Sequence, residues 1–207
     1  MRLILASASP RRRELLTQAG FKFAVEAADV DETQREGEEA GAYVLRLAEE
    51  KARAVLARYP THDDRAVVNG APILTEPLVV LGADTCVVCG EEILGKPADA
   101  SDAERMLRRL SGRTHRVLTG VAAVSRAGTV SGVETTEVVF SAIPEAELAA
   151  YCATAEPMDK AGAYGIQGYA ARWIPRIDGC YFSVMGLPIA RTVRLIDEAL
   201  RNCVPAE

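Results

Sequence analysis

A short apolar run, Leu78–Leu81, most constrains how this chain can fold. The run is too brief to be a buried helix, so it indicates a strand that is buried on both faces. Gly82 and Ala83 then remove side-chain bulk, and Asp84 and Thr85 follow directly. We expect the strand to reach a cleft here, because a carboxylate is costly to bury unless a cation or hydrogen-bond donors compensate it. Taken alone, an aspartate after a strand is more typical of a turn or a helix cap than of a functional site.

The composition is that of a globular protein. The 207 residues are 49% hydrophobic, enough for a sizeable core, and we expect a single domain over residues 1–207 with two lobes. The net charge of -5 does not suit a nucleic-acid binder, although a basic pocket for a small anion remains open. The sequence contains no long apolar span and no recognisable signal peptide, so we expect a cytoplasmic protein that contacts no membrane. Five scattered cysteines indicate reduced thiols.

The first helix is expected to begin in an unusual way. After a strand over residues 2–6, Ser9 can cap a helix that has Pro10 at its first position. Three arginines, residues 11–13, fill the first turn, where the helix dipole disfavours each cation by about 0.3–1 kcal/mol. Free amides, serine hydroxyls and guanidinium groups together predict a phosphate site. The alternative is that the arginines point into solvent, which we expect most of Arg13.

Two further charged residues are ambiguous. A second strand is expected over residues 21–27, and the acidic turn after it contains Glu32, which a solvated surface would explain equally well. A long amphipathic helix over about residues 38–58 places Lys51 on its apolar stripe, four residues after Leu47. The Lys51 ammonium either extends to solvent or points into a site, and the periodicity favours neither.

The middle of the chain returns to the strand described first. Residues 59–76 lack periodicity and indicate an exposed connection with a small hairpin. Cys86 and Cys89 form a C-x-x-C pair inside the strand, where a redox or zinc role is not favoured. A brief return strand precedes Lys96, and the simplest hairpin register brings Lys96 beside Asp84.

The remaining pattern predicts further alternation of helices and strands. The elements are a helix from Asp99 or Ser101 to about residue 110, strands over 114–124 and 129–143, a helix from Pro144, a strand over 173–177 and a last helix over 188–200. His115 is more typical of a structural hydrogen bond than of catalysis. With only two histidines in the chain, a Ser-His-Asp hydrolase is a poor fit.

A glycine-rich stretch, residues 157–168, is the second unusual segment. Three glycines and two alanines surround Asp159, Lys160, Tyr164 and Gln167. Such a loop packs too closely for bulky side chains and leaves a few polar groups projecting, which is how a backbone wraps around a ligand. A tight structural turn is the alternative.

Seven short motifs follow one another along the chain. They are SASPRRRELL (7–16), LAEEKA (47–52), GADT (82–85), GKP (95–97), SGRTHRVLTG (111–120), DKAGAYGIQG (159–168) and VMGLP (184–188). Together they resemble the Maf family of nucleotide pyrophosphatases, and the form of the sixth resembles the branch that acts on dTTP and UTP. The resemblance implies an α/β fold with a mixed twisted sheet, flanking helices and two lobes around a central cleft, similar to inosine triphosphate pyrophosphatases.

The same resemblance assigns roles to nine residues. It implies that Asp84 is the proton acceptor of a reaction that converts dTTP or UTP to the monophosphate and pyrophosphate. The other assigned residues are the base-specificity positions Arg11, Thr85 and Gln167 and the substrate and metal site residues Ser7, Arg12, Glu32, Lys51 and Lys96. We expect Mg²⁺ or Mn²⁺ to be held by Glu32 and the substrate phosphates, with Asp84 as a further ligand.

Two departures and two rival functions accompany the resemblance. The connection at 59–76 is longer than the family pattern leads us to expect, and Cys86 and Cys89 replace aliphatic residues. The first rival is a nucleotide-binding regulator of septum formation, which would need no base beside a metal ligand. The second is a nucleotidyl transferase, which would require an acceptor. A homodimer is expected only because dimers are frequent.

Overall fold

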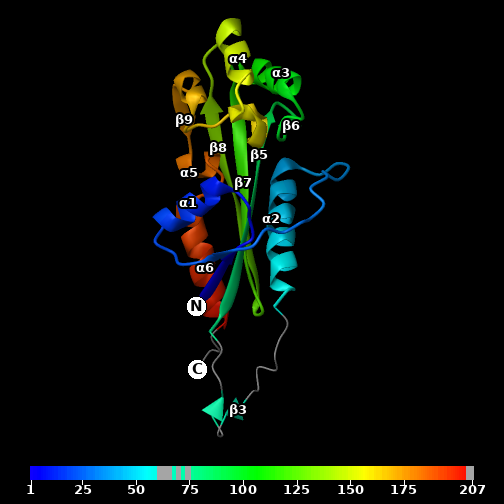
Figure 1. Ribbon diagram of the computed structural model, residues 1–207. Coiled ribbons are helices and arrows are strands. Elements are labelled where there is room, and N and C mark those ends of the chain that lie inside the picture. Colours follow the sequence, from blue (N-terminus) through cyan, green and yellow to red (C-terminus); the bar gives the residue numbers. More distant parts are fainter. Residues whose placement is uncertain (60–66, 69–70, 73–75, 204–207) are drawn as a thin grey trace.

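Three twelve-residue strands, β5, β7 and β8, form the centre of an open mixed sheet in the computed structural model, which describes residues 1–59, 67–68, 71–72 and 76–203 (Figure 1). The strand order is β2-β1-β5-β7-β8-β9, and β6 also pairs with β5. The seven strands are β1 (Arg2–Leu5), β2 (Ala24–Val25), β5 (Leu78–Cys89), β6 (Glu92–Leu94), β7 (Thr114–Ser125), β8 (Gly128–Val139) and β9 (Arg176–Asp178).

Helices connect and cover these strands. They are α1 (Pro10–Gln18), α2 (Ala40–Leu56), α3 (Ala100–Leu110), α4 (Glu145–Cys152), α5 (Tyr181–Val184) and α6 (Ile189–Cys203), with the 3₁₀ turns η1 (Glu156–Asp159), η2 (Ala161–Ala163) and η3 (Tyr169–Trp173). The expected mixed α/β fold is therefore confirmed. None of the helices that the structure describes has the length and apolarity needed to cross a bilayer.

The edge of β5 that faces β1 and β6 is paired at its two ends. β1 runs parallel to β5 over Leu78–Leu81, whereas β6 pairs antiparallel with it over Val87–Cys89. Between these partners, residues 82–86 lie on an edge that neither β1 nor β6 pairs, while β7 covers the opposite edge. The strand continues past Asp84 and leaves a gap beside it, which agrees with the expectation that the strand reaches a cleft at this residue.

Helix α2 lies directly against one face of the sheet because two glycines allow it (Figure 1). A Cβ atom on Gly82 would lie 2.0 Å from the carbonyl oxygen of Ala48, and one on Gly120 would lie 2.3 Å from that of Val44. Real side chains never approach a backbone atom so closely, so both strands need glycine where α2 crosses them. The close contact fixes the depth of α2 over the sheet.

Two hydrophobic core clusters lie in different parts of the molecule, and we call these parts its two lobes. In Figure 1, α1 and α6 lie on the side of the sheet opposite α2, while α3 and α4 gather at one end of the long strands. Leu15 and Ile196 belong to the cluster under α1 and α6, and Leu107 and Leu148 belong to the cluster at the far end. Because β5 and β7 contribute to both clusters, the same strands run through both lobes.

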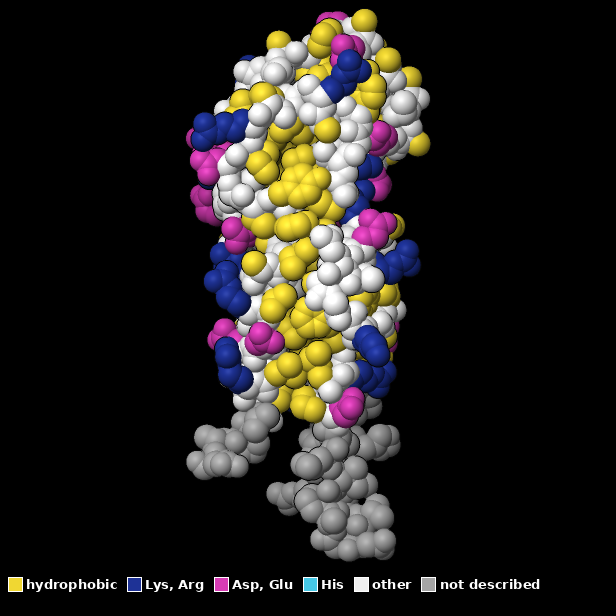
Figure 2. Space-filling view, turned by 90° about the vertical axis from the view of Figure 1, so that its left-hand side faces the viewer, with side chains coloured by type: hydrophobic (Ala, Val, Ile, Leu, Met, Phe, Trp, Pro, Cys, Tyr) yellow, Lys and Arg dark blue, Asp and Glu magenta, His cyan; other side chains and the backbone are white. Residues whose placement is uncertain are grey.

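One face of the molecule carries a band of apolar side chains. Figure 2 shows the side on which α1, α5, α6 and β9 lie in Figure 1, with charged side chains along both margins of the band. The core cluster beneath α6 has partly buried apolar members, among them Phe182 and Ile189. Apolar atoms normally make up more than half of a protein surface, so such a band alone assigns no function.

Several predicted elements differ in extent from those observed. The strand expected over residues 21–27 is only Ala24–Val25, and the one expected over 173–177 is preceded by η3 and covers Arg176–Asp178. The hairpin expected within the 59–76 connection is present, since β3 (Val67–Val68) pairs antiparallel with β4 (Ala71–Pro72). Residues 60–66, 69–70 and 73–75 of that connection, with His62, lie outside the described residues.

Candidate active site

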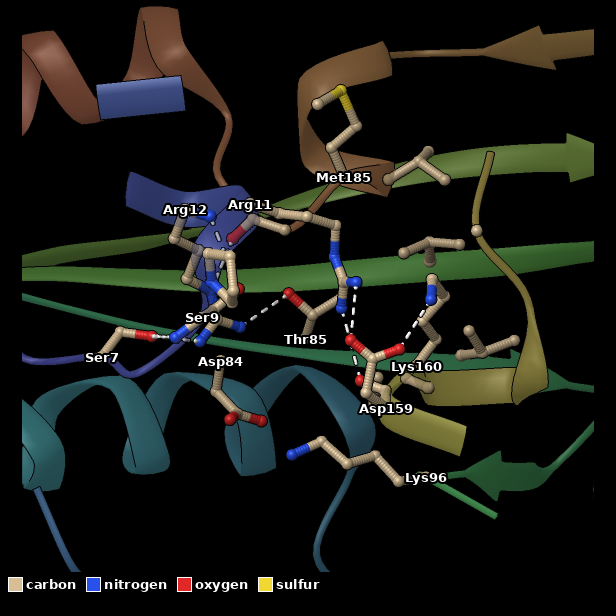
Figure 3. A pocket seen from close by; sticks show the side chains of 18 of the residues that line it. Ser7, Ser9, Arg11, Arg12, Asp84, Thr85, Lys96, Asp159, Lys160 and Met185 are labelled. Atoms are coloured by element: carbon tan, nitrogen blue, oxygen red, sulfur yellow. Dashed lines mark hydrogen bonds and ion pairs between the residues drawn. The ribbon is translucent and has the colours of Figure 1, made fainter. Parts of the chain in front are cut away.

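A cavity of about 710 Å³ opens beside the unpaired stretch of β5 and receives side chains from both lobes (Figure 3). Its volume lies in the range of small-molecule sites. All nine residues assigned by the family resemblance line it: Ser7, Arg11, Arg12, Glu32, Lys51, Asp84, Thr85, Lys96 and Gln167. The sequence therefore identified residues that the fold brings together, whereas their individual roles stay predictions.

Asp84 lies on the face of β5 that α2 covers and forms an ion triad with Lys51 of α2 and Glu32 of the preceding loop, which we call the acid side. Asp84 shares this face with Gly82 because side chains alternate along a strand. Lys51 Nζ lies 2.6 Å from Asp84 Oδ1 and 2.6 Å from Glu32 Oε1. The Lys51 side chain is only 10% exposed, so the ammonium points inward and not into solvent.

The Glu32 carboxylate is ionised by its cationic neighbours. Partial burial disfavours its charge, but the hydrogen bond and charge of Lys51, with the charges of Lys96 and Arg12, outweigh this and lower the pKa of Glu32. Lys96 is exposed, and in Figure 3 its ammonium points toward the Asp84 carboxylate, as the hairpin register predicted. The acid side thus combines two carboxylates with two lysines.

The loop that carries Glu32 is tied to α2 by two side chains. The Tyr43 hydroxyl donates to the carbonyl oxygen of Glu32 at 2.9 Å, and Arg46 Nη2 donates to that of Thr33 at 3.1 Å. Arg46 also forms a two-pronged ion pair with Glu38, with Nε–Oε1 and Nη2–Oε2 distances of 2.6 and 2.8 Å. The hydrogen bond from Arg46 lowers the pKa of Glu38 to about 2. These contacts hold the Glu32 loop next to Lys51 and Asp84.

Thr85 lies on the opposite face of β5, where it forms a group with Arg12 of α1 and with Ser7, which we call the arginine side. As predicted, Ser9 caps α1 by accepting a hydrogen bond from the Arg12 amide, and Pro10 follows it. The Arg12 guanidinium donates to Ser7 Oγ at 3.2 Å, to Thr85 Oγ1 at 3.2 Å and to the carbonyl oxygen of Gly186 at 2.9 Å. Desolvation by burial lowers the pKa of Arg12, partly opposed by the charge of Asp84.

The two other arginines of the first turn behave differently from Arg12. Arg11 Nη1 lies 2.9 Å from Asp159 Oδ2, and Lys160 Nζ lies 2.6 Å from the other oxygen of the same carboxylate (Figure 3). This pair links α1 to the glycine-rich stretch of the other lobe. Arg13 is exposed, in agreement with the expectation that it is the most solvated of the three.

The glycine-rich stretch packs as tightly as the sequence indicated. A Cβ atom on Gly168 would lie 1.8 Å from Glu156 Oε1, so the Glu156 carboxylate packs directly against the glycine that follows Gln167. Gln167 is exposed and lines the cavity. The sequence did not single out Glu156, whose carboxylate also accepts hydrogen bonds from the Tyr169 amide at 3.1 Å and the Tyr151 hydroxyl at 3.2 Å. A single glutamate before the glycine-rich motif gave no sign in the sequence that its carboxylate would accept these hydrogen bonds.

Two other residue types have structural surroundings. His115 is buried, bonds the Tyr164 hydroxyl at 2.8 Å through Nε2 and has its pKa lowered by burial to about 4. All five cysteines are free, as expected of reduced thiols. Burial, with the charge of Asp84, raises the pKa of Cys86 to about 12, which makes a reactive thiolate there unfavourable.

The donor set of the acid side suits a hard divalent cation. Within residues 1–59 and 76–203, no three His, Cys, Asp or Glu side chains are grouped to hold a metal by themselves. Glu32 and Asp84 nevertheless present carboxylate oxygens on two sides of one ammonium nitrogen. Carboxylate oxygens are the ligands that Mg²⁺ and Mn²⁺ prefer, and Mg²⁺ usually completes its shell with water and substrate phosphates. The residues present therefore fit the expected cation.

The fold and cavity define a class of protein, namely a mixed α/β protein with a site for a phosphorylated small molecule. Guanidinium and ammonium groups favour phosphate, and paired carboxylates favour a cation bound with it. Residues 2–199 match the family described as Maf-like protein, and the chain belongs to this family. The resemblance drawn from the seven motifs is thereby confirmed.

Curated relatives match over nearly their full length. A protein from Koribacter versatilis named dTTP/UTP pyrophosphatase is 49% identical over 199 residues, which are 96% of this chain and 95% of the relative. A protein of the same name from Symbiobacterium thermophilum is 50% identical over 196 residues, covering 95% of this chain and 93% of the relative. One from Myxococcus xanthus is 49% identical over 197 residues, covering 95% and 92%.

Proposed function

We propose that this protein is a nucleoside triphosphate pyrophosphatase that hydrolyses dTTP and UTP to the monophosphate and pyrophosphate. The observation that carries the proposal is the convergence of Arg12, Lys51 and Lys96 around the carboxylates of Asp84 and Glu32 in one cavity. The names of relatives that match almost the whole chain support the same activity and the same substrates. The proposal includes a cytoplasmic location, where these nucleotides are made and used.

The first requirement of the reaction is neutralisation of the substrate. A nucleoside triphosphate carries about four negative charges, which repel an attacking water molecule until cations screen them. Arg12 lies opposite the acid side across the β5 edge, and Lys96 points toward the same edge, so the two can contact a triphosphate from both sides. A bound divalent cation, held by Glu32 and Asp84, would supply further charge stabilisation.

The second requirement is a base for the attacking water. Asp84 is 13% exposed and lies beside the cavity, where it can accept the proton of a water molecule. The oxygen of that water bonds to the α-phosphorus, and the bond from the α-phosphorus to the bridging oxygen breaks. Pyrophosphate leaves with the electron pair of that bond. The ion pair with Lys51 orients the Asp84 carboxylate for this step.

The third requirement is recognition of the base. Gln167 carries one amide donor group and one carbonyl acceptor, which match the O4 acceptor and N3–H donor of thymine and uracil. Arg11 lies beside the same loop through its ion pair with Asp159. We propose that these residues face the pyrimidine end of the cavity and that Arg12 and the lysines face the phosphate end.

The decisive test uses the purified protein with Mg²⁺ or Mn²⁺ and a panel of triphosphates in water enriched in ¹⁸O. We expect dTTP and UTP to be consumed fastest, pyrophosphate to be released, and ¹⁸O to appear in the monophosphate. Release of inorganic phosphate, or ¹⁸O in the pyrophosphate, would place the attack on another phosphorus and refute the mechanism. Binding without turnover would favour a regulator, and dependence on an added acceptor would favour nucleotidyl transfer.

A further inference from the structure

A chain of hydrogen bonds runs from Arg12 into the protein interior. Arg12 Nη2 lies 3.2 Å from Thr85 Oγ1, Thr85 Oγ1 lies 2.9 Å from Thr119 Oγ1, and Thr119 Oγ1 lies 2.8 Å from the carbonyl oxygen of Ser183. Thr85 and Thr119 are direct partners on β5 and β7, which places their side chains on the same face. Thr119 is completely buried and is not among the residues that line the cavity.

The direction of this chain is fixed by its two ends. A carbonyl oxygen can only accept, so the Thr119 hydroxyl donates to Ser183, and its oxygen then accepts from Thr85. A guanidinium group can only donate, so Arg12 donates a hydrogen bond to the oxygen of Thr85. Each hydroxyl has one proton, and both protons are therefore committed within the protein.

We infer that Thr119 is a positioning residue, which orients the Arg12 guanidinium through Thr85. The hydroxyl of Thr85 has no proton to offer a nucleotide, so Thr85 influences the substrate by holding Arg12 and not by donating to the base. Of the five N–H groups of Arg12, three are bound by Ser7, Thr85 and Gly186, and the other two have no acceptor among the described residues. A phosphate group can accept from these two, which makes their orientation matter.

The turn that contains α5 supports the same guanidinium from a second direction. The carbonyl oxygen of Gly186, at the end of the turn, accepts a hydrogen bond from Arg12 Nε at 2.9 Å. The carbonyl oxygen of Ser183, inside the turn, accepts a hydrogen bond from the Thr119 hydroxyl. One backbone turn thus anchors Arg12 directly and through the two threonines. Hydrogen bonds that polarise one another inside a protein are stronger together than separately. Loss of the Thr119 hydroxyl should therefore weaken the hydrogen bond between Arg12 and Thr85.

The test compares Thr119→Val with a matched control. Thr136 on β8 is also completely buried, donates to the carbonyl oxygen of Cys180 at the start of α5 and accepts from the Cys180 amide, but has no bond to Thr85 or Arg12. Thr136→Val therefore removes a similar buried hydroxyl outside the chain. Thr119→Ser keeps the hydroxyl and should restore the function lost in the valine variant.

This inference rests on the proposed function, and steady-state kinetics with dTTP is its first readout. We expect Thr119→Val to raise KM about tenfold or more, with a smaller change in kcat. This is the effect expected when one hydrogen bond between Arg12 and a substrate phosphate is lost. Thr136→Val should lower the melting temperature about as much as Thr119→Val does but leave KM unchanged. Thr85→Val should raise KM as Thr119→Val does, and the double variant should show little further effect because both break one chain.

Three outcomes would overturn the inference: a wild-type KM in Thr119→Val, an equal rise of KM in Thr136→Val, or no rescue by Thr119→Ser. If the wild type releases no pyrophosphate from any triphosphate, the proposed function fails separately. The affinity for inorganic pyrophosphate, measured by calorimetry, then becomes the readout for the same variants. Weaker binding in Thr119→Val alone would support the positioning role, and equal binding in all of them would refute it.

Discussion

The two faces of β5 hold Asp84 and its sequence neighbour Thr85 in very different surroundings. On the acid side, Asp84 contacts a charged partner directly, since Lys51 lies 2.6 Å from both Asp84 and Glu32. On the arginine side, Arg12 is bound by neutral hydroxyl and carbonyl oxygens from Ser7, Thr85 and the α5 turn. The difference follows from strand alternation, which sends adjacent side chains to opposite faces.

This difference separates two tasks. A guanidinium held by neutral acceptors leaves its positive charge available to a phosphate, whereas a carboxylate paired with an ammonium is held in an orientation from which it can accept a proton. We therefore expect changes on the arginine side to weaken substrate binding and changes on the acid side to slow the chemical step. The unpaired edge of β5 lets one ligand reach both.

The largest effect is expected from Asp84→Asn. The amide keeps the size of the side chain but cannot act as a base, so kcat should fall by about 10²–10⁴-fold, the usual contribution of general-base catalysis. KM for dTTP should change little, and release of pyrophosphate is the measurement. Near-normal turnover in this variant would remove the proposed base and end the distinction between the two sides.

A smaller and different effect is expected from Arg12→Lys. Lysine retains the charge but cannot bond Ser7, Thr85 and Gly186 at once, so the remaining donors lose their orientation. We expect kcat/KM for dTTP to fall about 10- to 100-fold, mainly through KM. The exposed Arg13 offers a matched control, since Arg13→Lys should behave as wild type. A fall confined to kcat would show that Arg12 acts in the chemical step.

Gln167→Leu tests the end of the cavity away from both sides. Loss of the amide should reduce the preference for dTTP and UTP over CTP about tenfold, because a hydrogen-bonding site discriminates by leaving groups unpaired. The ratio of kcat/KM values for UTP and CTP is the measurement. The proposed role of Gln167 requires this ratio to change while hydrolysis itself continues.

The smallest effect concerns the loop that supplies Glu32 to the acid side. The pKa of Glu38 is lowered from 4.5 to about 2 by its hydrogen bond with Arg46, so its contribution to stability is complete above about pH 5 and is lost as the pH falls toward 2. Glu38→Gln should therefore destabilise the protein by about 1 kcal/mol at pH 7. Thermal unfolding of both proteins from pH 7 to pH 2.5 should show this difference shrinking, and a constant difference would contradict the assignment.

Sequence patterns predicted the capped start of α1 and the membership of the site, but not the geometry that joins its parts. The apolar stripe of α2 placed Lys51 on the inner face without fixing its depth, which depends on the close contact of α2 with Gly82 and Gly120. The gap beside Asp84 depends on where β1 and β6 pair with β5, which no local pattern encodes.

The bonds from Thr119 and Arg12 to the α5 turn were likewise hidden. They use backbone carbonyl groups, which every residue possesses, and a threonine in an alternating strand is unremarkable by itself. Residue types that carry charge could therefore be identified in advance, whereas the neutral contacts that orient them required the fold.

Calorimetric titration of dTTP, in the presence of Mg²⁺, into the Asp84→Asn and Arg12→Lys variants tests the division of tasks most directly. We expect the Asp84→Asn protein to bind dTTP at least as tightly as the wild-type KM suggests, and Arg12→Lys to bind it about tenfold more weakly or worse. Loss of binding in Asp84→Asn, or unchanged binding in Arg12→Lys, would contradict this division of tasks.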